Sequence, residues 1–128
     1  MITGTVNADY EAVINLRVQG PRGYEQEVDA IIDTGFNGFL TLPPALITAL
    51  RLTRLSRGRA MLADGSETLF DICRVSVFWD GQLRYVEVDA VDTTPLVGMS
   101  LLEGYDLYIR IEDGGSVVIK APGQGSLC

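Results

Sequence analysis

The sequence predicts an all-β protein, a closed β-barrel or sandwich with one or two short helices. Apolar residues recur at alternate positions in many short segments, which is the period of a half-buried strand. Asp-Gly pairs separate several of these segments, as they do in tight hairpins. The 128 residues are 47% hydrophobic, which is enough for one core. We therefore expect a single domain over residues 1–128.

The amino-terminal part predicts a short strand followed by a β-hairpin. Residues 2–6 are β-prone, and residues 12–18 place apolar side chains at mostly alternate positions. A Gly-Pro-Arg-Gly turn follows, and residues 24–32 return as a second strand. This hairpin delivers a carboxylate, Asp33, at its far end.

The next segment predicts a strand and then a helix. Residues 39–42 are apolar and run into Pro43-Pro44. Proline suits the first helical turn, where its missing N–H costs nothing. Residues 45–50 then supply one short amphipathic helix.

Two further hairpins follow, and each turns at an Asp-Gly pair. Residues 52–62 lead to the first of these turns, at Asp64-Gly65, and residues 67–78 return from it. Residues 82–91 return from the second. This region therefore predicts three more strands.

The carboxyl-terminal part repeats a pattern from the middle of the chain. Residues 94–98 predict a short strand that ends in glycine, and residues 99–104 predict about one helical turn. Residues 105–111 and 116–120 predict the last two strands, separated by a Glu-Asp-Gly-Gly turn. An apolar pair, a turn glycine and a short helix thus occur twice, but an Asp stands at the turn in the first copy alone.

The overall charge and hydropathy exclude several kinds of partner. The net charge of −7 argues against binding to nucleic-acid phosphates. No window approaches a run of ~18 apolar residues, so no membrane span is expected. The first residues also lack the basic and unbroken apolar segments of a signal peptide, and we expect a cytoplasmic protein.

The absence of histidine narrows the possible chemistry. It excludes Ser-His and Cys-His nucleophilic catalysis within one chain, and histidine-ligated metals as well. Cys73 and Cys128 are not spaced as a metal site, and no Gly-rich phosphate loop occurs. Cys73 lies in an apolar strand pattern and is expected in the core. Carboxylates remain for acid–base chemistry, and no cofactor is expected.

Asp33 is the carboxylate in the most informative position. It ends an apolar strand at Ile31-Ile32 and is followed by Thr34-Gly35. Burying an unpaired Asp beside apolar residues is costly, because desolvation disfavours its charged form. Asp-Thr-Gly is also a common turn composition. Taken alone, the motif also fits a surface turn. The flanking segments are needed to distinguish a surface turn from a functional carboxylate.

Three segments, in this order and at this spacing, resemble the retropepsin-like aspartic proteases, which are single-domain relatives of pepsin that work as homodimers. They are similar to that family's active-site loop, the tip of its flap hairpin and its second apolar-apolar-glycine loop. In this chain they are Ile31-Ile32-Asp33-Thr34-Gly35, Ala63-Asp64-Gly65 and Leu96-Val97-Gly98. The resemblance covers nearly all of the chain. Residues 33–43 are most similar to a prokaryotic branch of short stand-alone proteins.

The resemblance implies a homodimeric aspartic endopeptidase that acts on a peptide or protein. Asp33 would be catalytic, Thr34 would hold two active-site loops together across the dimer axis, and Gly35 would permit the turn. Viral members usually carry a small residue after this glycine, whereas a ring at this position changes what the loop presents to a peptide. The expected substrate-binding residues are Phe36, Asn37, Ala63, Asp64, Gly65, Leu96 and Val97.

Physical reasoning also leads to a dimer. Hydrolysis without a metal or a covalent nucleophile needs one group to accept a proton from water and another to donate one. Two carboxylates that share a proton do both, because like charges ~3 Å apart cannot both ionise. The chain contains one Asp-Thr-Gly, so a second copy related by a two-fold axis must supply the other Asp33.

Other candidate residues have simpler interpretations. Asp92 opens an Asp-Thr-Thr segment without glycine and is interpreted as a loop residue, while Asp64 is a solvated hairpin residue that can still touch substrate. Trp79 and Tyr85 are interpreted as core or strand-face residues. The basic run Arg51, Arg54, Arg57 and Arg59 is interpreted as a solvated strand face, with contact to an acidic partner as the alternative. The alternative function is a non-catalytic dimeric module that binds peptide or protein and retains the protease fold.

Overall fold

Strands form most of the regular structure of this chain. The computed structural model describes residues 1–123, so Cys128 lies outside the described residues. The strands are β1 (Ile2–Val6), β2 (Ala12–Gln19), β3 (Glu25–Ile32), β4 (Leu40–Leu42), β5 (Arg54–Met61), β6 (Glu67–Trp79), β7 (Gln82–Ala90), β8 (Leu96–Val97), β9 (Asp106–Ile109) and β10 (Ser116–Lys120). The helices are α1 (Pro44–Ala49) and α2 (Met99–Leu102). The predicted all-β class with short helices is confirmed. Within residues 1–123, no helix has the length and apolar character needed to span a membrane.

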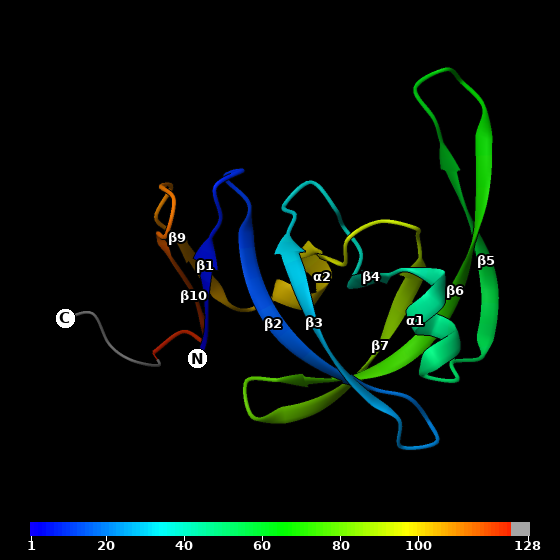
Figure 1. Ribbon diagram of the computed structural model, residues 1–128, viewed down its shortest axis with the longest axis horizontal. Helices are drawn as coiled ribbons and strands as arrows, with labels where there is room; N and C mark the ends of the chain where they lie inside the picture. The colour runs from blue at the N-terminus through cyan, green and yellow to red at the C-terminus, as the bar shows by residue number, and fades with distance from the viewer. Residues whose placement is uncertain (124–128) are drawn as a thin grey trace.

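Six strands close into a barrel. They follow one another in the order β6-β7-β4-β8-β3-β2, and β2 pairs back onto β6, with Val18 opposite Val77. Strand β5 extends the sheet beyond β6, and β1, β10 and β9 extend it beyond β2 (Figure 1). The sheet is thus a closed six-stranded barrel, with further strands paired outside it at β6 and at β2.

The interior of the barrel follows from the alternation of side chains along its strands. In β2, Ile14, Leu16 and Val18 are buried, while the residues between them face outward. The same alternation runs through β6, where Cys73 and Trp79 are in the core. Burial raises the pKa of the Cys73 thiol. The expectation that Cys73 is a core residue is confirmed.

Strands β5 and β6 form a long hairpin that projects beyond the barrel (green in Figure 1). The three arginines of β5, Arg54, Arg57 and Arg59, are exposed and form ion pairs with carboxylates of β6. Arg51 is not part of this strand face, because it lies in the turn between α1 and β5. Its backbone is in the left-handed region, with φ of 57°, and its guanidinium lies 5.4 Å from the centre of the Tyr24 ring. The predicted strand face therefore holds for three of the four arginines.

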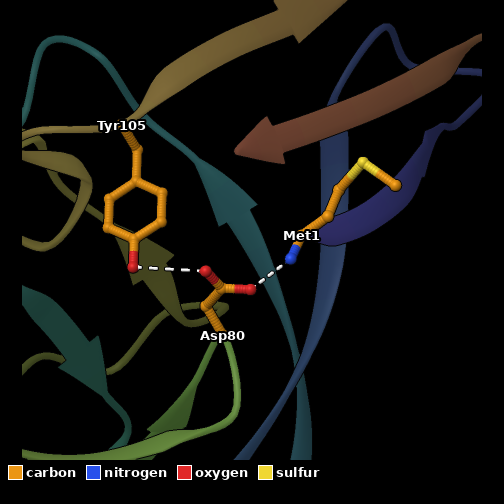
Figure 2. A network of polar contacts seen from close by, with 3 residues as sticks. All are labelled: Met1, Asp80 and Tyr105. Atoms are coloured by element: carbon orange, nitrogen blue, oxygen red, sulfur yellow. Dashed lines mark hydrogen bonds and ion pairs between the residues drawn. The ribbon is translucent and has the colours of Figure 1, made fainter. Parts of the chain in front are cut away.

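A polar network ties the amino terminus to the β6–β7 turn (Figure 2). The α-ammonium group of Met1 donates to one oxygen of Asp80, and the Tyr105 hydroxyl donates to the other at 3.4 Å. The Tyr105 ring also meets Trp79 edge to face, with centroids 5.9 Å apart. Three segments far apart in the sequence are thereby held together at one place.

Candidate active site

Asp33 lies directly after β3, where the chain leaves the barrel. Strand β3 pairs in antiparallel fashion with β2 and in parallel fashion with β8, with Ile31 opposite Leu96 and Ile32 opposite Val97. The Asp33 N–H donates to the Val97 carbonyl at 2.9 Å. The backbone of Asp33 is therefore fixed to β8 at the end of a strand that lies between β2 and β8, while its side chain is half-buried rather than in the core.

The turn after Asp33 is built on its own carboxylate. The Gly35 N–H donates to Asp33 Oδ1 at 2.9 Å, and the Phe36 N–H donates to the Asp33 carbonyl at 3.1 Å. Asp33 Oδ2 accepts no hydrogen bond from residues 1–123. Asp33 thus forms the turn with one oxygen and keeps the other unpaired within the described residues, so a turn role does not exclude a role in a site.

A second loop crosses the Asp33 loop and holds it. The N–H and hydroxyl groups of residues 98–100 donate to all four carbonyls of residues 36–39. The pairs are Met99 N–H to Phe36 at 2.8 Å, Ser100 Oγ to Asn37 at 2.5 Å, Ser100 N–H to Gly38 at 3.1 Å and Gly98 N–H to Phe39 at 3.0 Å. This contact explains why the second apolar-apolar-glycine segment lies beside the first.

Gly98 leaves no room for a side chain where the two loops touch. A Cβ on Gly98 would lie 2.1 Å from the Gly38 carbonyl oxygen. A Cβ on Gly38 would lie 2.6 Å from Cζ of Phe36, whose ring occupies the space above it. The Phe36 ring therefore packs back onto the loop pair. It is not among the residues that line the cavity at Asp33.

Thr41 supports the site from inside the barrel. It is the buried polar side chain of β4, 4% exposed, and its Oγ1 accepts a hydrogen bond from the Leu96 N–H at 2.9 Å. Strand β8 is two residues long. The Thr41 hydroxyl therefore supplies the hydrogen-bond acceptor for the Leu96 N–H at the start of this short strand. Sequence reasoning missed both Thr41 and Ser100, because their partners are distant in the chain.

A cavity of about 400 Å³ opens at Asp33. Its walls come from the β1–β2 turn, β2, β3, β8 and the segment around β9. The lining residues are Tyr10, Glu11, Ala12, Ile31, Ile32, Asp33, Thr34, Leu96, Ile109 and Ile111. Of the residues singled out from the sequence, Asp33, Thr34 and Leu96 meet here. Val97 is buried, and Asn37 is exposed outside this cavity.

The tip of the hairpin formed by β5 and β6 lies outside this cavity. Ala63, Asp64 and Gly65 are exposed, and none of them lines it. Asp64 Oδ1 accepts hydrogen bonds from the Ser66 hydroxyl at 2.6 Å and the Ser66 N–H at 2.9 Å, and these bonds lower the pKa of Asp64. Gly65 has φ of 86°, which suits glycine. Asp64 therefore stabilises the turn.

The described chain offers no obvious ligand set for a metal. No group of three or more cysteine or carboxylate side chains gathers in residues 1–123.

Comparison with known proteins relates this geometry to one fold. No family model and no curated protein matches the sequence. The structure is similar to the crystal structure of a retropepsin-like aspartic protease from Rickettsia conorii, with a TM-score of 0.60. The match covers 94% of this chain and 89% of that chain, at 18% sequence identity. The chain therefore has the retropepsin-like fold, with Asp33 after β3 and the hairpin of β5 and β6 beyond the barrel.

Proposed function

We propose that the protein is a homodimeric aspartic endopeptidase that hydrolyses peptide bonds. The observation that carries this proposal is the half-buried Asp33 at a cavity, with its backbone bonded to β8 and the loop that follows it held by the crossing loop. Rigid support of this kind keeps a catalytic carboxylate in one orientation. The crystal structure of the Rickettsia conorii protein, named as an aspartic protease, supports the same assignment.

Two Asp33 side chains across a two-fold axis would share one proton. One carboxylate accepts a proton from the attacking water, and the other, protonated, donates its proton to the peptide carbonyl oxygen. Because the pair works while it holds one proton, the rate should be bell-shaped in pH.

The surface around the cavity supports a partner chain there. Tyr10 is 70% exposed and Ile111 is 68% exposed, and both line the cavity at Asp33. Large apolar side chains that are exposed beside one another mark contact surfaces. A second copy that packs against Tyr10 and Ile111 at the rim would bring its own Asp33 to the open cavity.

The first prediction is that Asp33→Asn abolishes hydrolysis and leaves the fold intact. Asparagine retains an Oδ1 that accepts the Gly35 N–H, so the turn survives, but it cannot accept a proton from water. Cleavage of a mixed peptide library should fall by at least about a thousandfold. The melting temperature of the two proteins, measured by circular dichroism, should agree.

Two outcomes would contradict the enzymatic assignment. Wild-type rates in Asp33→Asn would exclude this carboxylate as catalytic. Peptide binding without cleavage, equal in both proteins, would favour the non-catalytic binding module.

A further inference from the structure

The cavity at Asp33 contains a second carboxylate, Glu11. Glu11 ends the turn between β1 and β2, and Asn7 fixes this turn. Asn7 Nδ2 donates to Glu11 Oε1 at 3.0 Å, and Asn7 Oδ1 accepts the N–H groups of Asp9 and Glu11, each at 3.0 Å. The carboxylate is therefore held in place at the cavity wall. Its Oε2 accepts no hydrogen bond from residues 1–123.

The other walls are largely apolar. Ala12, Ile31 and Leu96 line them on the barrel side, and Ile109 and Ile111 line them on the other. No Lys or Arg is among the lining residues. Arg110, which stands between the two isoleucines in sequence, is paired with Glu112 through Nε at 2.8 Å. Glu11 is thus an acidic group in an apolar cavity that the described chain leaves without a cation.

These features suit one type of side chain. Lys and Arg carry a long apolar stem that packs on apolar surface and a charged end that seeks an anion. A cavity of about 400 Å³ is within the size range of pockets that enclose small ligands. An acidic side chain would meet two carboxylates, Glu11 and Asp33, and would be repelled.

We propose that Glu11 makes this cavity a subsite for a Lys or Arg side chain beside the scissile bond. This inference rests on the proposed peptidase function and names its substrate class. By two-fold symmetry, the two copies of the cavity receive the residues on the two sides of the bond.

The test compares matched peptides that differ in one residue beside the cleaved bond: lysine, norleucine or glutamate. Norleucine has the apolar stem without the charge. For the wild-type protein we expect kcat/KM to be about fivefold higher for lysine than for norleucine, as for a partly exposed ion pair. Glutamate should be the poorest of the three.

The matched variants are Glu11→Gln and Asp9→Asn. Gln keeps the Oε1 acceptor for Asn7, so the turn and the melting temperature should be retained. In Glu11→Gln, the ratio of kcat/KM for the lysine peptide to that for the norleucine peptide should fall to about one. Asp9 lies in the same turn but does not line the cavity, so Asp9→Asn should keep the preference.

Binding separates failure of this inference from failure of the proposed function. Uncleavable reduced-amide analogues of the lysine and norleucine peptides are titrated and followed by fluorescence anisotropy. If no peptide is cleaved but lysine binds better in a Glu11-dependent way, the peptidase assignment fails and the subsite stands as a binding site. If cleavage occurs and Glu11→Gln keeps the lysine preference, the subsite is refuted and the peptidase stands. If Glu11→Gln stops cleavage of every peptide while its melting temperature is unchanged, Glu11 is catalytic and the subsite is refuted.

Discussion

Thr41 shows how a single hydroxyl inside the barrel supports the site on its surface. Thr41→Val removes the acceptor and leaves the Leu96 N–H unpaired at a partly buried position. Such a loss costs about 1–3 kcal/mol. We expect the free energy of unfolding, from denaturant titration, to fall by this amount. Thr41→Ser keeps the oxygen and should be closer to wild type, whereas a Thr41→Val protein within about 0.5 kcal/mol of wild type would contradict this role.

Asp89 gives a prediction about pH. Burial first, and then the neighbouring charge of Glu87, raise the pKa of the Asp89 carboxyl above its usual value of 3.8. The folded protein therefore holds this proton more tightly than the unfolded chain does. Ionisation of Asp89 opposes folding once the pH exceeds the raised pKa, and the penalty vanishes below about pH 3.8.

Asp89→Asn should therefore raise the melting temperature at about pH 7 and change it much less at about pH 3.5. Glu87→Gln should give a smaller rise at neutral pH, because Glu87 is the second cause and not the first. Melting curves at both pH values test this. An equal effect of Asp89→Asn at the two values would show that the carboxyl charge is not responsible.

At the scale of the elements, local patterns predicted the strands well. Alternation and the Asp-Gly turns gave β1, β2, β3, β6 and β7 nearly to the residue, because both signals act within a few positions. The last strand pair was less clear: residues 105–111 were expected as a strand, but β9 ends at Ile109. Ile111 instead lines the cavity at Asp33, which depends on contacts that no local pattern encodes.

The candidate site, like the strands, could be predicted only where short sequence motifs identify its residues. Asp33 and Leu96 could be proposed from their motifs, and the structure places both at one cavity. Ser100 and Glu11 could not, because each lies beside Asp33 or its loop, which is distant in sequence. The role of Phe36, Asn37, Ala63, Asp64, Gly65 and Val97 in substrate binding remains a prediction. All of them except buried Val97 lie on the Asp33 loop or at the hairpin tip, outside the cavity at Asp33.

The hairpin of β5 and β6 allows a test that separates a structural carboxylate from a catalytic one. Asp64→Ala removes the acceptor for both Ser66 donors. Amide exchange at the hairpin tip, measured by NMR or mass spectrometry, should become faster because the local turn opens more often. Hydrolysis should stay within about tenfold of wild type, far above Asp33→Asn.

Asp64→Asn is the matched control for this change. Its Oδ1 still accepts from Ser66, so exchange at the tip should remain slow. If Asp64→Ala were as inactive as Asp33→Asn, Asp64 would have to take part in the chemistry.

At the scale of the whole molecule, the two crossing loops are unequal copies of one pattern. The first brings Asp33 to the surface, and the second brings Gly98, which a side chain could not replace without moving the Gly38 carbonyl. The loop that contains Gly98 therefore supports the loop that contains Asp33 within one chain, and it has no Asp at the matching position. The proposed dyad would therefore need its second Asp from another molecule.

The last prediction concerns this requirement. Wild-type protein and Asp33→Asn are mixed in equal amounts and left to exchange subunits, and cleavage is measured at a fixed wild-type concentration. If subunits assort at random, one quarter of the dimers are wild type, one half are mixed and one quarter are mutant. Mixed dimers hold half a dyad and should be inert, so activity should fall to about half of that of wild type alone. Sedimentation should show dimers in all three samples, and activity per chain should fall on dilution. Unchanged activity in the mixture, once exchange is verified by mass-labelled subunits, would show that one Asp33 is sufficient and that the site is complete in a single chain.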